Sequence, residues 1–257
     1  GRSLGASSVR RNDHYQEPFK PLLPGIRFAE FNNLDSVKAL VNEKTCAILM
    51  ETIQGEGGIY PASEEFLKGV REVCDDNGIL LMLDEIQCGM GRSGKMFAWQ
   101  WYDVVPDVMT VAKALGNGVP IGAFLAKGEA AAAMVPGDHG TTYGGNPFVT
   151  AAASRVLDIF EKRDIPGHAA EIGEYLKEKL EELKSRCSLI ADCRGKGLIQ
   201  GVELTVPAGP VVTKALLEEK LVLITAGEKI IRFVPPLVIE KEDVDEMIKR
   251  LEKALMN

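Results

Sequence analysis

Short apolar runs, each the length of a buried strand, are the feature that most limits what this sequence can fold into. They span residues 45–51, 79–83, 108–112 and 121–125 and are separated by polar, glycine-containing segments. Runs of this length are typical of strands in a sheet that is covered on both faces. Where strands alternate with helices along a chain, the strands usually pair in parallel through crossover helices. We therefore expect an α/β fold with a mostly parallel sheet and helices on both of its faces.

One connecting segment carries helix signals at both ends. Ser63 is a suitable N-cap, and Phe66, Val70 and Val73 recur at helical spacing until Gly78 ends the pattern. This segment joins the first apolar run to the second. It predicts the strand, helix and strand order of a parallel unit.

The character of the sequence changes after residue 148. An alanine-rich segment reaches residue 160, and a charged helix with an apolar stripe follows, formed by Ile172, Leu176, Leu180 and Leu183. Short strands around 197–204 and 230–234 and an amphipathic C-terminal helix complete the chain. We predict a large domain over residues 1–163, lacking its N-terminal portion, and a smaller α+β domain over residues 164–257.

Charge and cysteine content exclude several classes of function. The 30 basic and 37 acidic residues give a net charge of −7, which lacks the positive field that nucleic acid requires. The apolar runs fall far short of the roughly 20 residues that a membrane helix needs. The five cysteines form no C-x-x-C pair, so neither a disulfide framework nor a zinc site is indicated. We expect no nucleic-acid or membrane partner, no metal, and a reducing compartment.

Two short motifs match known patterns but lack the surroundings that those patterns need. Residues 89–94 read G-M-G-R-S-G, yet an aromatic-rich segment follows where a nucleotide-binding fold needs a helix. Residues 1–5 fit G-x-S-x-G, but no strand precedes them in this chain. We therefore do not expect nicotinamide binding or hydrolase chemistry.

Asp84 and Lys113 form a stronger pair of candidates, because each follows directly on an apolar run. Taken singly, Asp84 would be a turn residue and Lys113 a surface lysine. Ligands of open α/β sheets, however, lie at the carboxyl ends of strands. A desolvated lysine can become a nucleophilic amine, and a buried carboxylate needs a cationic partner. Pyridoxal phosphate offers an aldehyde to the lysine and a pyridinium to the carboxylate.

The surrounding residues resemble a known family. Residues 83–94, L-D-E-I-Q-C-G-M-G-R-S-G, and 110–116, T-V-A-K-A-L-G, look like the class III pyridoxal-phosphate aminotransferases of fold type I. Residues 51–58, 140–147 and 230–237 agree, so the resemblance covers essentially the whole chain. Within the class, the chain is most similar to acetylornithine aminotransferases, with ornithine and 4-aminobutyrate enzymes close behind.

The resemblance implies roles for the residues that match the family motifs. Lys113 would form the Schiff base with pyridoxal 5'-phosphate, Asp84 would face its pyridine nitrogen, and Gln87 would contact its phenolic oxygen. Thr142 resembles the threonine that reaches the phosphate of the neighbouring subunit's cofactor, which implies a homodimer with shared sites.

The family's substrate-binding residues have counterparts as well. Arg232 and Arg2 resemble arginines that bind substrate carboxylates, and Glu56 resembles the glutamate that pairs with the first of them. The implied activity is transfer of the terminal amine of N-acetylornithine to 2-oxoglutarate, giving glutamate, in arginine biosynthesis. The implied location is the cytoplasm, or an organelle matrix in a eukaryote.

The chain departs from the family pattern at two places. Thr52 stands where proline is usual, a change that we expect to alter only local stiffness. The family's helix N-terminus for the phosphate lies before Gly1, so we expect weak cofactor binding by this polypeptide and a longer parent protein.

Other functions remain open at this stage. Three alternatives share these residues: ornithine or 4-aminobutyrate transamination, a decarboxylase or aminomutase of the same fold, and a catalytically incomplete fragment. A nucleotide-binding module is the least favoured alternative.

Overall fold

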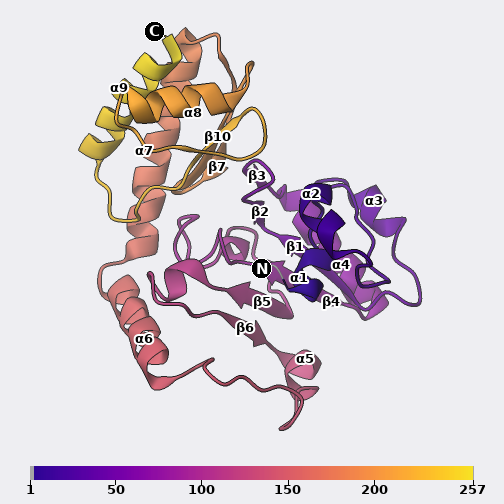
Figure 1. Ribbon diagram of the computed structural model, residues 1–257. Helices are drawn as coiled ribbons and strands as arrows, with labels where there is room; N and C mark the ends of the chain where they lie inside the picture. The colour runs from indigo at the N-terminus through magenta and orange to yellow at the C-terminus, as the bar shows by residue number, and fades with distance from the viewer. Residues whose placement is uncertain (1–2, 257) are drawn as a thin grey trace.

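The strands of the two halves of the chain form separate sheets in the computed structural model, which describes residues 3–256 (Figure 1). The first sheet has the order β1-β4-β5-β6 and the second the order β7-β8-β10-β9, while β2 and β3 form a hairpin between them. The strand bounds are β1 Ala47–Glu51, β2 Ile53–Gln54, β3 Tyr60–Pro61, β4 Leu80–Asp84, β5 Val108–Val111, β6 Ala123–Ala126, β7 Ile190–Lys196, β8 Ile199–Leu204, β9 Ile224–Thr225 and β10 Ile230–Phe233.

The first sheet confirms the strands expected from the apolar runs. β1, β4 and β5 are parallel, whereas β6 is antiparallel to β5. The direction of β6 follows from its connection. Between β5 and β6 the chain forms only the 3₁₀ turn η3 (Lys113–Leu115), and a parallel crossover needs a dozen or more residues, usually in a helix.

The predicted helix between β1 and β4 is α4 (Glu64–Asn77). The Ser63 hydroxyl accepts a hydrogen bond from the backbone N–H of Phe66 at 3.1 Å, and Gly78 ends the helix with φ of 63°. Glycine adopts that left-handed conformation without the steric cost that a Cβ would bring. The buried face of α4 packs on the sheet through a core formed by Phe66, Leu67, Val70, Cys74, Leu81 and Leu83, among others.

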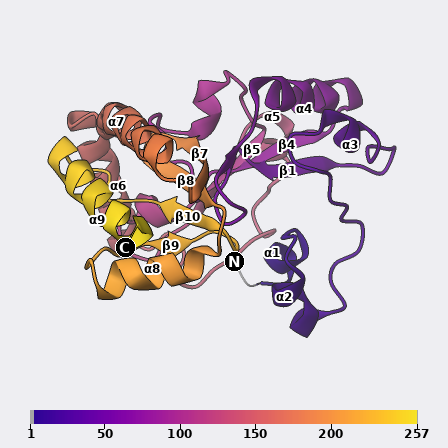
Figure 2. The same ribbon diagram turned by 90° about the horizontal axis from the view of Figure 1, so that it is seen from above.

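Three helices pack against the second sheet: α7 (Ile165–Arg186), α8 (Ala208–Leu217) and α9 (Lys241–Met256), grouped in Figure 2 apart from α3 and α4. The apolar stripe predicted on α7 is buried, each of its four residues being at most 2% exposed, and it packs against β7, β8, β10 and α9. β7 was not predicted, because most of its residues are polar or only half-buried and give no alternating pattern.

α6 (Pro147–Lys162) leads into α7 through Asp164, whose carboxylate accepts a hydrogen bond from the backbone N–H of Gly167 at 3.2 Å. Phe160 and Ile165, on either side of this junction, share one buried cluster. The domain boundary at residue 163 stays a prediction. The remaining helices are α1 (Leu4–Ser8), α2 (Asp13–Gln16), η1 (Glu17–Phe19), α3 (Leu34–Lys38), η2 (Ala98–Trp101) and α5 (Gly128–Ala132).

Within residues 3–256, no helix combines the length and the apolar character that crossing a bilayer requires.

We expect Leu180→Ala to lower the free energy of unfolding by about 2–5 kcal/mol, because the truncation leaves a cavity around a fully buried side chain. Leu217→Ala is the control, since that leucine is 63% exposed and its truncation should cost no more than about 0.5 kcal/mol. Chemical denaturation measures both changes. Equal effects would contradict the assignment of α7 to the core.

Candidate functional site

Polar side chains stand side by side where the parallel strands end. The register pairs Glu51 of β1 with Asp84 of β4, and Asp84 with Thr110 of β5. The Asp84 Oδ1 atom accepts hydrogen bonds from the Thr110 hydroxyl at 3.2 Å and from the backbone N–H of Ile86 at 2.9 Å. Among the described residues no hydrogen bond reaches Asp84 Oδ2. A half-buried carboxylate is therefore held in a fixed orientation with one oxygen available.

Lys113 begins the turn η3, two residues after β5 ends. Its φ of 43° lies in the left-handed region, which costs a residue with a Cβ about 1–2 kcal/mol. Strain of this kind is concentrated at functional sites. The lysine is exposed, so the described part of this chain does not supply the desolvation that the sequence led us to expect.

Glu51 is a member of the site that the sequence analysis did not propose. Burial raises its pKa above the ordinary value of 4.5, and the hydrogen bond from the Gly55 backbone N–H, 2.9 Å long, opposes the shift. Asp84, Lys113 and Glu56 also act electrostatically on this carboxylate. Each of these three groups therefore lies in the surroundings of Glu51. Glu51 could have been found by the argument used for Asp84, since it too is an acidic residue at the carboxyl end of a predicted strand.

Arg232 of β10 joins the second sheet to this site. Its Nη1 atom donates hydrogen bonds to Glu56 Oε1 at 2.6 Å and to Gln87 Oε1 at 3.0 Å. Arg232 is 7% exposed, and Gln87 Nε2 lies 3.4 Å from Glu56 Oε1. A Cβ on Gly55 would lie 2.3 Å from the Gln87 side chain, so any other residue at position 55 would require the Gln87 amide to move. Glu56, Gln87 and Arg232 thus form one cluster.

Two further residues proposed from the sequence are not brought into this cluster. Thr142 lies in the exposed loop before α6, where Tyr143 is 82% exposed. Arg2 falls outside the described residues.

A buried carboxylate, Glu85, holds the segment that follows Asp84 and carries Gln87. It accepts hydrogen bonds from the backbone N–H groups of Ala98 at 2.8 Å and Trp99 at 3.1 Å, and from the Thr52 hydroxyl at 2.9 Å. Burial raises the pKa of Glu85, while these hydrogen bonds act in the opposite direction. The expectation that Thr52 alters only local stiffness was therefore wrong. Proline has no hydroxyl with which to make this bond.

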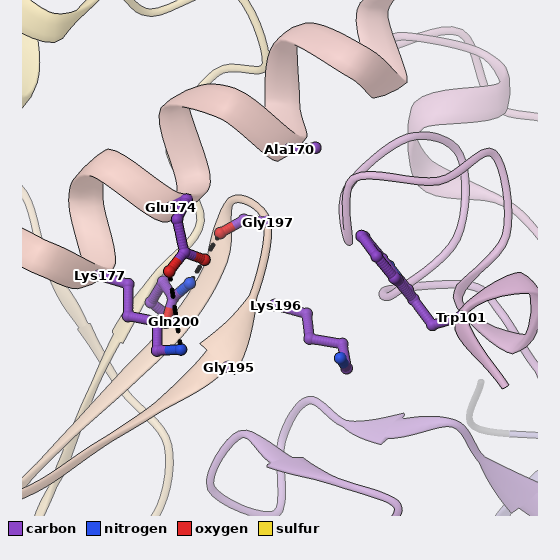
Figure 3. A pocket seen from close by; sticks show the side chains of 8 residues that line it. All are labelled: Trp101, Ala170, Glu174, Lys177, Gly195, Lys196, Gly197 and Gln200. Atoms are coloured by element: carbon purple, nitrogen blue, oxygen red, sulfur yellow. Dashed lines mark hydrogen bonds and ion pairs between the residues drawn. The ribbon is translucent and has the colours of Figure 1, made fainter. Parts of the chain in front are cut away.

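A hollow of about 180 Å³ lies elsewhere, between α7, the turn joining β7 to β8, and Trp101 (Figure 3). In Figure 3 Lys196 extends toward Trp101, and its ammonium lies 4.9 Å from the centre of that ring. Gln200 turns the other way and donates a hydrogen bond to the Gly197 carbonyl at 2.9 Å. The hollow is separate from the cluster of Arg232.

Comparison with known proteins identifies relatives of the chain. The family model described as aminotransferase class-III matches residues 1–255. The acetylornithine aminotransferase of Clostridium acetobutylicum is 47% identical over 256 residues, which are 99% of this chain and 66% of that protein. The ornithine aminotransferase 2 of Staphylococcus aureus N315 is 44% identical over 252 residues, covering 98% of this chain and 63% of that protein.

The solved structures that resemble this chain include aminotransferases as well. An ornithine aminotransferase from Toxoplasma gondii, in which PLP partly occupies the active site, is 30% identical, with a TM-score of 0.94 over 100% of this chain and 61% of that one. The chain thus spans slightly less than two thirds of the length of the relatives that it matches.

The ion pair between Glu56 and Arg232 predicts a pH-dependent contribution to stability. The hydrogen bond from Arg232 lowers the pKa of Glu56 below its ordinary value of 4.5. A carboxyl group with a lowered pKa stabilises the folded state above its unfolded-state pKa, and this contribution is lost as the pH falls through the folded-state pKa. The difference in unfolding free energy between the wild type and Glu56→Gln should be fully present near pH 7 and should be lost as the pH falls below 4.5 and through the lowered pKa of Glu56.

The size of this difference should stay below about 1 kcal/mol, because the Glu56 side chain is 60% exposed and water screens the pair. Denaturation from pH 3 to pH 7 measures it, with Glu161→Gln on α6 as the control. A difference that does not change with pH would show that the pair is not formed.

Proposed function

We propose, because the chain belongs to the aminotransferase class-III family, that the protein transfers the terminal amine of N-acetylornithine to 2-oxoglutarate. The products are the corresponding semialdehyde and glutamate, and the reaction is a step of arginine biosynthesis. The observation that supports this most is that Asp84, Lys113 and Glu56 all act on the Glu51 carboxylate at the end of β1, while Arg232 binds both Glu56 and Gln87.

The proposed cofactor is pyridoxal 5'-phosphate, and the available donors fit its ring. Asp84 presents a carboxylate that is oriented by Thr110 and Ile86, which suits a protonated pyridine nitrogen. Lys113 presents a primary amine that acts electrostatically on Glu51, the residue paired with Asp84 on the neighbouring strand, and an amine suits an aldehyde carbon. Gln87 presents an amide that can donate to a phenolic oxygen. Each of these assignments is part of the proposal.

When bound, pyridoxal phosphate supplies an aldehyde that takes up the amino group and an aromatic ring that withdraws electrons from the reacting carbon. The rest of the chemistry belongs to side chains of this protein. The Lys113 Nζ atom would hold the cofactor, and as a free amine it would move the proton of the substrate carbon that bears the amino group. Asp84 keeps the ring nitrogen protonated, since a carboxylate in contact favours the charged form.

Arg232 and Glu56 let one site accept two unlike substrates. The Arg232 guanidinium binds the side-chain carboxylate of 2-oxoglutarate, because arginine and carboxylate match in geometry and charge. The amine donor carries no carboxylate at that position, so Glu56 occupies the guanidinium instead, as it does in this structure. Arg2 is the proposed partner of the other substrate carboxylate.

We also propose a homodimer in which Thr142 binds the phosphate of the neighbouring subunit's cofactor. The large exposed side chains around it support such an interface, since Tyr143 is 82% and Phe148 is 73% exposed. We place the protein in the cytoplasm, where the five free thiols would remain reduced.

Lys113→Ala should lower the rate of glutamate formation by at least about 1000-fold, because both the covalent attachment and the proton transfer depend on this amine. The assay uses the intact protein with pyridoxal phosphate, N-acetylornithine and 2-oxoglutarate, and no added amine. Lys249→Ala on α9, at a side chain that is 66% exposed, is the control. Normal transamination by Lys113→Ala would contradict the assignment, and release of carbon dioxide by the wild type would indicate a decarboxylase.

Arg232→Ala should raise the KM for 2-oxoglutarate by about 10- to 100-fold, with a smaller effect on the KM for the amine donor. The physical reason is that only the keto acid needs the guanidinium to bind a carboxylate. Steady-state kinetics with each substrate varied in turn measure both constants, and Arg155→Ala, at an exposed position on α6, is the control. Equal increases for the two substrates would contradict the role given to Arg232.

A further inference from the structure

A row of side chains crosses the second sheet and faces the β2–β3 hairpin. Arg194 of β7 is in register with Gly201 of β8, and Gly201 is in register with Arg232 of β10. Residues directly opposite each other in antiparallel strands project from the same face. The row therefore consists of the Arg194 guanidinium, the hydrogen atom that is the side chain of Gly201, and the Arg232 guanidinium, in that order. The loop 55–59 of the hairpin, which carries Glu56, lies against this face.

The middle position of the row receives the hairpin. A Cβ on Gly201 would come within 2.8 Å of the Ile59 Cβ atom, so the absence of a side chain there admits Ile59. Ile59 is fully buried and shares a cluster with Ile53, Cys88, Ala98 and Ile199. A Cβ on Gly58 would come within 2.7 Å of Ile230, a buried residue two positions before Arg232 on β10 and on the same face of the sheet. The loop is thus closely packed on the sheet at both residues.

Arg194 binds the hairpin at Gly58 and Tyr60. Its Nε atom donates a hydrogen bond to the Gly58 carbonyl at 3.1 Å, and its guanidinium lies 4.0 Å from the centre of the Tyr60 ring. Nη1 is held in turn by Glu203 at 2.7 Å and by Asp192 at 3.1 Å. The side chain of Arg194 is only 13% exposed. Arginine can stack on a ring, donate a hydrogen bond to a carbonyl and pair with carboxylates at the same time, because its guanidinium is planar and has several N–H donors. Lysine cannot make this combination of contacts as well.

We propose that Arg194 is a positioning residue that sets how strongly Glu56 competes for Arg232, and hence how the site divides its affinity between the amine donor and the keto acid. Arg194 and Arg232 hold the loop 55–59 at opposite ends of one row, and Arg194 binds backbone and ring atoms that do not have to move. Glu56 is 60% exposed and can leave Arg232 by turning its side chain alone. The backbone of the loop stays docked and returns the carboxylate to the same place.

This inference rests on the proposed function and predicts a change with a definite direction. With Arg194→Gln the loop loosens, so Glu56 spends less time on Arg232. The neutral end of the amine donor then meets an unmasked cation, and its KM rises. The KM for 2-oxoglutarate stays constant or falls, because the guanidinium is more available to it. We expect the ratio of the donor KM to the keto-acid KM to rise about three- to tenfold.

The experiment compares the intact wild-type protein, Arg194→Gln and Arg186→Gln, all loaded with pyridoxal phosphate. Arg186 is the matched control, because it is a 52% exposed arginine at the end of α7 that pairs with Glu252. Hydrogen exchange of the amides of residues 55–59, measured without substrates, should be faster in Arg194→Gln alone. Should Arg194→Gln fail to fold, Tyr60→Leu removes the stacked ring at a 37% exposed position and is expected to shift the ratio in the same direction.

An unchanged KM ratio, or an equal rise of both constants, overturns the proposal even if amide exchange increases, since a purely structural role would give that result. Absence of transamination by the wild type would instead contradict the proposed function. The exchange measurement would then decide by itself whether Arg194 holds the loop.

Discussion

The lateral register of parallel strands is the constraint on which the rest of the site depends. The strands β1, β4 and β5 are parallel, and their register pairs Glu51 with Asp84 and Asp84 with Thr110. These three residues therefore lie side by side near the carboxyl ends of the strands. A shift of one residue in β4 would turn the Asp84 side chain to the opposite face of the sheet. The buried side chains of α4 fix that register, since Leu81 and Leu83 must face the helix for the core to close.

Opposite charges at this edge come from both halves of the chain. The carboxylates of Glu51, Asp84 and Glu56 come from the first half, where Lys113 is a nearby cation. Arg232 arrives from the second sheet and forms its ion pair with Glu56. An arginine as buried as Arg232 is stable only with such partners, because removing a guanidinium from water is costly. The site therefore helps to hold the two sheets together.

Glycine and threonine residues with no role in the chemistry decide how closely these groups approach. Gly55 admits Gln87 and Gly201 admits Ile59, so the loop 55–59 can lie between the segment that carries Gln87 and the second sheet. Thr52 binds the buried Glu85, which in turn holds the backbone at Ala98 and Trp99. The close packing of this region explains how a loop of small residues can present Glu56 at a defined place.

The features that could be predicted from the amino-acid sequence depend on neighbours along the chain. The strand positions of the first sheet, the caps of α4, the buried stripe of α7 and the placing of Asp84 and Lys113 after strands all follow from local pattern. The pairing of Arg232 with Glu56 was suggested only by resemblance, since 176 positions separate them. The partner of Thr52 and the contacts of Arg194 with the hairpin became visible only in the folded chain. These depend on contacts between distant segments, and neither hydrophobic period nor residue spacing carries information about which distant groups will meet.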